Sequence, residues 1–310
     1  MSIDIKIIPG TEASIPDPPR PKRSGDTDPR QYFPMRPMTG EQRNALRRAA
    51  EELSGALSGF WMHRVPGKRQ AAINMDHYLT GAGQDREFSP GNVDDLFDAL
   101  TESSTTRHQS LEQGFLDKIR EDLSGAAVGT IRRYNSLNSD PSSPNWGEPW
   151  FGLSSEGGTN WFYAVGSFWV AFGGRARRDA DGVEVYYRAY IYDRYNWDVE
   201  RDSGMTIGKT TFIPNEIEWL IDQDVLTDQN MPEFRRWQPD YVTAVPDNPS
   251  TDVDEGGYRV NDALLGTMME FGEAQPFDIV GSGRIRSVFL NYASEKEGSN
   301  EPLPSESKGR

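Results

Sequence analysis

The sequence contains no cysteine, and this absence excludes disulfide bonds, zinc–thiolate sites and a cysteine nucleophile. Histidine is scarce as well, because the chain has only 3, at His63, His77 and His108. They lack the spacing of metal ligands on one helix, so we interpret them as structural or surface side chains. The chain also has no phosphate-binding loop motif. No apolar run approaches the ~20 residues needed to cross a bilayer.

Positive charge is in short supply. The chain has 33 Lys and Arg against 48 Asp and Glu, which gives a net charge of −15. A surface this acidic repels phosphate backbones, so we expect no nucleic-acid partner. A signal peptide of the usual form is missing too, because the apolar stretch Ile3–Ile8 is short and is interrupted by Asp4 and Lys6. We therefore predict a protein that is made in the cytoplasm and is exported or delivered without a classical signal peptide.

Aromatic and proline residues are plentiful, but in different parts of the chain. Aromatics make up 11% of the 310 residues, which is ample material for a packed core. The first 38 residues hold eight prolines and few apolar side chains, which predicts a disordered leader that is dispensable for folding. This leader is either a linker or a recognition segment for a delivery apparatus. The predicted regions are a leader at 1–38, a helical region at 39–134, a β-rich domain at 145–291 and a disordered tail at 292–310.

Helical periodicity dominates residues 39–134. Thr39 and Gln42 have the spacing of a capping box, and Ser89-Pro90 has the pattern of a second helix start. Apolar side chains recur at helical intervals in four segments, the last of them running from Thr106 to Leu123. Four amphipathic helices in about ninety residues predict a small helical bundle.

After residue 145 the apolar period changes from helical to alternating. Trp161–Phe172 and Gly182–Tyr195 are predicted as antiparallel neighbours, with the turn within Arg175–Asp181, because Asp181-Gly182 is a hairpin signal. The fold class is therefore α+β, with a twisted antiparallel sheet or partial β-barrel and packed helices. Further elements are predicted as helices at Pro214–Asp224 and after Asn261, and as strands at Gln275–Val280 and Arg284–Leu290.

The predicted strand Gly182–Tyr195 leads into the run Asp-Arg-Tyr-Asn-Trp-Asp at 193–198. This run has more polar and aromatic groups than a solvated strand end needs. If the strand continues in phase, Asp193 and Tyr195 share the face of its apolar residues. One interpretation is a carboxylate-centred site, in which Asp193 is a base or metal ligand, Tyr195 orients the substrate, and Lys209 or Arg194 supplies positive charge. The other is a hydrogen-bonded corner that serves only the fold. The candidate site residues are Asp193, Tyr195, Asn196, Asp198 and Lys209.

Two segments of the second half carry a resemblance to a known group of proteins. The motif Asp-Arg-Tyr-Asn-Trp-Asp at 193–198 and the closing segment Gly-Glu-Ala-Gln-Pro-Phe-Asp-Ile-Val-Gly at 272–281 resemble actinobacterial toxin-like proteins. The helical segment Met-Asp-His-Tyr-Leu-Thr-Gly-Ala-Gly at 75–83 fits them too, so the resemblance spans about residues 60–290. It implies a toxin-like role and no particular activity.

The same strand end is also similar, more distantly, to colicin M-type bacteriocins, which cleave the peptidoglycan precursor lipid II. In that family a strand ends in Asp-x-Tyr-Asp and is followed by a His-Arg pair. Asp193 and Tyr195 match the first acid and the tyrosine, but Asn196 stands where the second acid is expected. No histidine follows His108, so the His-Arg pair is absent. What the resemblance implies is a cell-envelope target, and it leaves open whether the chain is an enzyme.

Together these patterns predict a bacterial toxin-like effector used in interbacterial antagonism. Its expected partners are a secretion or contractile delivery machine and an immunity protein. The alternative is a non-enzymatic binding or structural module, such as a component of a phage-like or contractile particle. The sequence leaves the cofactor, the metal requirement and the target molecule open.

Overall fold

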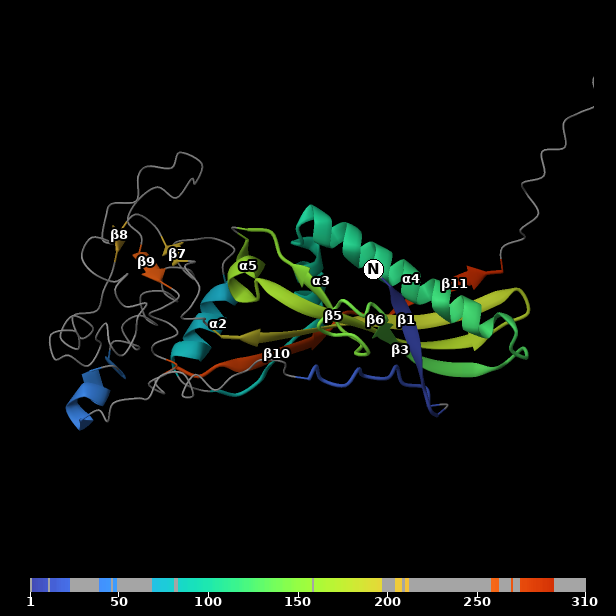
Figure 1. The fold of residues 1–310 in the computed structure, drawn as a ribbon, viewed down its shortest axis with the longest axis horizontal. Coiled ribbons are helices and arrows are strands. Elements are labelled where there is room, and N and C mark those ends of the chain that lie inside the picture. The colour runs from blue at the N-terminus through green and yellow to red at the C-terminus, as the bar shows by residue number, and fades with distance from the viewer. Residues whose placement is uncertain are drawn as a thin grey trace, which may run out of the picture.

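The computed structural model describes residues 2–10, 12–22, 39–45, 47–48, 69–80, 83–157, 159–196, 204–207, 210–211, 258–261, 269 and 274–292. These residues are organised around one open sheet with the strand order β1-β3-β5-β6-β10-β2, to which β4 and β11 add at the sides. The long helix α4 lies across one face of this sheet (Figure 1). The architecture confirms the predicted α+β class, and the sheet is open rather than a barrel.

The centre of the sheet is the hairpin of β5 (Ser167–Arg178) and β6 (Gly182–Tyr195). They pair antiparallel from Trp169 opposite Tyr192 to Arg178 opposite Val183, which confirms the predicted hairpin and its turn. The first strand begins later than predicted. The segment before it forms the short helix α5 (Asn160–Ala164), because the Thr159 hydroxyl accepts a hydrogen bond from the Phe162 N–H (3.1 Å) and caps a helical turn.

Two short strands pair with each outer edge of this hairpin. On the β5 side lie β3 (Ile131–Asn138) and β4 (Phe151–Ser154), and on the β6 side lie β10 (Phe277–Ser282) and β11 (Arg286–Asn291). The short strand β2 (Arg86–Phe88) pairs with β10 in parallel, whereas the other strand pairs of this sheet are antiparallel. The pairing of β6 with β5 ends at Tyr192, so residues 193–195 at the end of β6 pair with β10 alone.

The helices cover one face of this sheet and bury its apolar side chains. They are α2 (Arg69–Leu79), α3 (Pro90–Asp98) and α4 (Glu102–Ser124). As predicted, Ser89 caps α3, and the capping box of Thr39 and Gln42 forms (2.8 and 3.2 Å). However, α4 packs on β1, β4, β5 and β6, and α3 packs on β2 and β10. The helices that the sequence assigns to a bundle thus pack on the sheet, because its apolar face supplies the surface that they bury.

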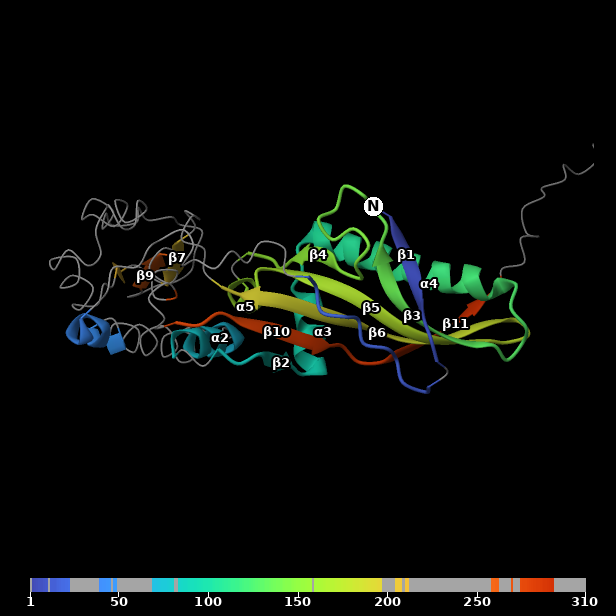
Figure 2. The same cartoon turned by 60° about the horizontal axis from the view of Figure 1, so that its bottom comes forward.

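The N-terminal segment differs from the predicted disordered leader. Ile3–Ile8 forms β1, an edge strand paired antiparallel with β3, and its Ile3 and Ile5 pack against the core. Residues 12–22 then run along the sheet on the face away from α4 (Figure 2). Gly173 permits this approach, since a Cβ there would lie 2.5 Å from the Pro16 carbonyl oxygen. Proline does not oppose this arrangement, because its fixed φ suits an extended chain that needs few backbone donors.

A separate small sheet contains β7 (Gly204–Ile207), β8 (Thr210–Thr211) and β9 (Tyr258–Asn261), in the order β7-β9-β8. The predicted helices at Pro214–Asp224 and after Asn261 lie outside the described residues, as do nearly all of the predicted tail and most of the first predicted helix. Among the helices that the structure describes, none has the length and apolar character to span a membrane.

Candidate functional site

The end of β6 places the two leading candidate residues on the apolar face of the sheet. Asp193 lies opposite Ile279 of β10, and Tyr195 lies opposite Phe277. The strand stays in phase to its last residue, so Asp193 and Tyr195 share the helix-facing side, as the alternation predicts. Asn196 follows the strand and is exposed. Asp198 and Lys209 lie outside the described residues.

Tyr195 is held in an aromatic cluster between the sheet and α2. Its ring stacks on Phe277 (centroids 5.1 Å apart, 21° between planes) and meets the edge of Tyr78 (5.8 Å). His77 adds its ring edge-on to Phe277 (4.5 Å), while its Nε2 lies 2.8 Å from the Gln84 carbonyl oxygen. The aromatic packing fixes the ring of Tyr195 beside Asp193. His77 is near this cluster, although the sequence indicated nothing more than an ordinary histidine.

Asp193 is a carboxyl group in an environment that favours its neutral form. Its side chain is buried, with the residue 8% exposed. This burial raises the pKa of Asp193 well above its ordinary value; a hydrogen bond from the Arg194 backbone N–H lowers it, and the charge of Asp278 raises it further. Because burial favours the protonated carboxyl group, Asp193 holds its proton more tightly than an ordinary aspartate, and in that form it can serve as a general acid.

Arg86 is a cation on the Asp193 side of the sheet that the sequence did not indicate. Arg86 of β2 lies opposite Ile279, which in turn lies opposite Asp193, so the three residues form one row across β2, β10 and β6. Its guanidinium donates a hydrogen bond to the buried amide oxygen of Asn74 on α2. Burial lowers the pKa of Arg86, and the nearby Tyr195 raises it. A half-buried cation on the same face of the sheet as a carboxyl group and a phenol is an arrangement that can stabilise developing negative charge.

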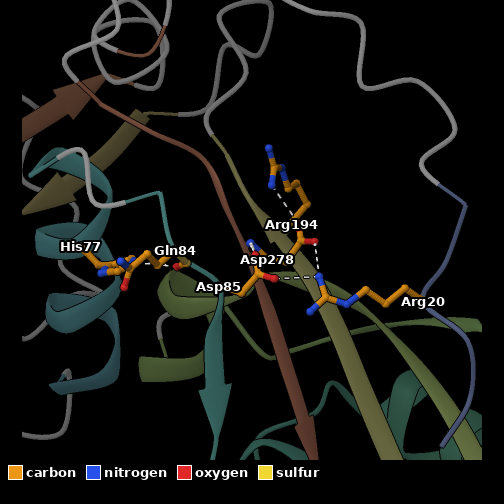
Figure 3. Close-up of polar contacts among 6 residues, drawn as sticks. All are labelled: Arg20, His77, Gln84, Asp85, Arg194 and Asp278. Atoms are coloured by element: carbon orange, nitrogen blue, oxygen red, sulfur yellow. Dashed lines mark hydrogen bonds and ion pairs between the residues drawn. The ribbon is translucent and has the colours of Figure 1, made fainter.

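Arg194, one of the two cations predicted for the site, lies on the opposite face of the sheet from Asp193. Its Nη1 donates a hydrogen bond to Asp278 of β10 (2.9 Å), the residue directly across the strands. Figure 3 shows that Arg20 of the N-terminal segment also forms an ion pair with Asp278 (3.2 Å) and a second ion pair with Asp85 (2.7 Å). The Asp278 backbone N–H donates to Asp85 (3.3 Å). These four residues tie the N-terminal segment, the loop before β2 and the strands β6 and β10 together.

Asp278 is the most buried member of this cluster, with 1% of its side chain exposed. It receives two guanidinium groups, from Arg20 and Arg194, and these charges compensate for its burial. One feature of the sequence could have indicated Asp278, because this acidic residue stands between two apolar residues of a predicted strand. Its partners lie 84 and 258 positions away along the chain, so no local pattern could identify them.

The site as described is thus two-sided. Asp193, Tyr195 and Arg86 lie toward the helices, while Arg194, Asp278, Arg20 and Asp85 lie toward the N-terminal segment. Among the residues that the structure describes, no group of three or more histidine, aspartate and glutamate side chains is arranged to hold a metal ion.

Comparison with known proteins gives one weak likeness. No protein family and no curated protein matches the chain. Among solved structures, the chain is similar to PaeM, a colicin M-like bacteriocin produced by Pseudomonas aeruginosa, with 11% identity and a TM-score of 0.30. The likeness covers 82% of this chain and 71% of PaeM. At this TM-score it carries no argument about activity, and the resemblance to actinobacterial toxin-like proteins stays a prediction.

Proposed function

We propose that this protein is a bacterial toxin-like effector, and that its functional site is the helix-facing side of the β6 end. The observation that carries the proposal is Asp193, a buried carboxyl group whose pKa is raised well above its ordinary value and which shares one face of the sheet with Tyr195 and with the half-buried Arg86. Strongly perturbed ionisable groups of this kind concentrate at functional sites.

The chemistry that suits these groups is proton donation to a leaving group. Asp193 would protonate the departing oxygen of a substrate, and Arg86 would stabilise negative charge that develops there. Tyr195, fixed by its stacking on Phe277, would position the substrate. The reaction class is thus hydrolysis of an ester or related bond: water would form the new bond to the electrophilic atom, the bond to the leaving oxygen would break as Asp193 protonates it, and the proton lost by the attacking water would return to Asp193.

The biological role that we propose is antagonism of competing bacteria through a cell-envelope target. The chain has a net charge of −15 and no cysteine, which suits a protein that passes between redox compartments. Delivery by a secretion or contractile machine and neutralisation by an immunity protein are parts of this proposal.

The second candidate is a binding or structural module, and one observation favours it. Asp278 is paired with two arginines, and this ion-pair cluster joins four separate parts of the chain, as a structural corner would. In this case Asp193 and Arg86 would contribute to the packing of the fold and no reaction would depend on them.

A growth assay separates the two candidates. The wild-type chain is expressed either in the cytoplasm or directed to the periplasm of a bacterial host, and growth is compared with that of Asp193→Asn, Tyr195→Phe and Arg86→Gln. The effector predicts that the wild type inhibits growth in at least one compartment and that Asp193→Asn relieves the inhibition while its thermal midpoint is kept. Asp179→Asn in the β5–β6 turn is the matched control, because it removes the same charge from an exposed position.

Tolerance of the wild-type chain in both compartments would favour the structural module. So would an Asp193→Asn variant that still inhibits growth as strongly as the wild type. A variant that inhibits less only because it unfolds is recognised by its lowered thermal midpoint, and Tyr195→Phe and Arg86→Gln then provide independent tests of the same site.

A further inference from the structure

A pocket of about 380 Å³ lies between the N-terminal segment and the sheet, away from the candidate site. Tyr186 and Arg188 of β6 line it, and they alternate with the helix-facing residues of that strand, so the pocket opens on the opposite face from Asp193. Its full lining is Ala13, Ser14, Ile15, Arg175, Tyr186, Arg188 and Ile285. The pocket therefore combines two arginines with aromatic, aliphatic and hydroxyl groups.

Arg175 of β5 is the unusual member of this lining. Among the described residues it makes no hydrogen bond and no ion pair, and its Nε is buried from solvent without a partner. Buried polar atoms are nearly always paired in folded proteins, so such an atom at a pocket calls for a partner that the chain does not provide. A guanidinium group offers five donors in a planar fork, which suits the oxygens of a phosphate or carboxylate.

The other charged groups around the pocket are already neutralised within the chain. Arg188 pairs with Asp17 (3.0 Å) and also donates hydrogen bonds to Tyr190 and Ser282 (2.8 and 3.3 Å). Arg133, which lies opposite Arg175 on β3, pairs with Glu12. Because these acids are engaged, the positive charge of Arg175 remains uncompensated at the pocket, in a chain that is strongly acidic overall.

The rim of the pocket is apolar and aromatic. Tyr186 lies directly opposite Arg175 across β5 and β6, and its side chain is 37% exposed. Ile285, before β11, is 60% exposed, and Ile15 lines the wall formed by the N-terminal segment. These surfaces would contact an organic group attached to the anion, whereas a bare inorganic ion would leave them in water.

We propose that this pocket binds the phosphate group of a soluble phosphate monoester that carries an aromatic or aliphatic substituent. The phosphate accepts hydrogen bonds from Arg175 and from the free donors of Arg188, and the substituent lies against Tyr186 and Ile285. The site is independent of Asp193 and needs the N-terminal segment in place, since residues 13–15 form one wall.

Isothermal titration calorimetry with phenyl phosphate tests the proposal on the full chain at low ionic strength. We expect the wild type to bind and Arg175→Gln to bind at least about tenfold more weakly, because a charge-assisted hydrogen-bond pair is lost. Arg177→Gln is the matched control. It removes the same charge from the same face of β5, but Arg177 pairs with Glu184 (3.1 Å) and does not line the pocket, so affinity should stay within about twofold.

Several results would overturn the proposal. They are no binding by the wild type at about 10 mM phenyl phosphate, equal affinity of the wild type and Arg175→Gln, and an equal loss in Arg177→Gln. Inorganic phosphate that binds as tightly as phenyl phosphate would overturn the role of the apolar rim. Arg175-dependent sedimentation with phosphatidic acid vesicles would assign the pocket to a lipid headgroup and overturn the soluble ligand. Arg175→Gln should fold normally, which an unchanged thermal midpoint would verify, because Arg175 makes no bonds in the described structure.

Discussion

The two faces of the β5–β6 hairpin are covered in different ways. On the helix side, Val183, Val185 and Ile191 are fully buried against apolar side chains of the core. On the other side, the N-terminal segment is fixed by polar contacts, in which Asp17 receives hydrogen bonds from Arg188 (3.0 Å) and Tyr190 (2.8 Å), and the Pro19 carbonyl receives one from Trp150 (2.8 Å). The helix side is thus held by apolar area that is buried from water, whereas the other side combines specific polar contacts with a small apolar cluster of Trp150, Ala171, Tyr190 and Tyr192.

Each face of the sheet buries one aspartate, and the two aspartates have different surroundings. On the helix side, burial raises the pKa of Asp193 and favours its neutral form, and among the described residues no cation forms an ion pair with its carboxyl group. On the other side Asp278 is just as inaccessible but receives two arginines. Asp193 of β6 and Asp278 of β10 thus differ by one position in the register of the two strands. Their side chains lie on opposite faces, and the partners on each face determine which protonation state is favoured.

The largest expected effect comes from removing the N-terminal cover. A chain that begins at Thr39 loses β1 and residues 12–22, and with them the burial of Ile3 and Ile5 and the polar contacts of Asp17 and Arg20. We expect the free energy of unfolding to fall by at least about 3 kcal/mol, since burying one aliphatic side chain is worth about 1.5–3 kcal/mol. Chemical denaturation measures this. An unchanged midpoint would mean that the segment does not stabilise the sheet.

A smaller effect is expected at the buried ion cluster. Asp278→Asn keeps the shape of the side chain but weakens the hydrogen bonds from Arg20 and Arg194, so we expect a loss of about 1–3 kcal/mol. Arg20→Gln, which removes one partner from an exposed position, should cost less than Asp278→Asn. Thermal unfolding of both variants gives the order, and the reverse order would contradict the central place of Asp278.

The replacement Asp193→Asn should change how stability depends on pH. The folded-state pKa of Asp193 is raised, so above the unfolded-state pKa of about 3.9 the folded chain binds more protons, and stability falls as the pH rises toward the folded value. Because asparagine cannot ionise, the variant should not lose stability in this way as the pH rises. We expect the variant to unfold a few degrees higher than the wild type at pH 7 and at the same temperature near pH 3. A variant that is less stable at pH 7 would indicate that the folded state does not raise the pKa of Asp193.

The smallest effect is expected at the exposed anchor of the N-terminal segment. Asp17 has 75% of its side chain exposed, so Asp17→Asn should lower the free energy of unfolding by about 0.5–1 kcal/mol. The loss should shrink in 1 M salt, since screening weakens exposed ion pairs. Denaturation at low and high salt measures both quantities, and a salt-independent loss above about 2 kcal/mol would show that Asp17 is more than a surface anchor.

Local signals in the sequence predicted much of the helix-facing half of the fold. Ser89-Pro90 begins α3, and Asp181-Gly182 follows the turn between β5 and β6, because caps and turns depend on neighbouring residues. The alternation of β6 also placed Asp193 and Tyr195 on the same face. The helical signal at Thr159 was missed, because the aromatic alternation after it resembles a strand.

The N-terminal cover could not be predicted in this way. Its contacts join residues such as Asp17 and Tyr190, which are 173 positions apart, and no local period encodes them. The same holds for Arg86, which lies in the same row of the sheet as Asp193 because β2 pairs parallel with β10. Whether Asn196, Asp198 and Lys209 join the site stays a prediction, and so do the domain boundaries.

The most direct test of the account is the protonation state of Asp193 itself. A titration followed by the NMR signal of its side-chain carboxyl carbon, assigned by its loss in Asp193→Asn, reports this group alone. We expect the carboxyl to keep its proton well above the ordinary range for an aspartate, because the carboxyl is buried and Asp278 is charged. A titration midpoint near the ordinary value of about 3.9 would contradict the assignment of Asp193 as a neutral acid.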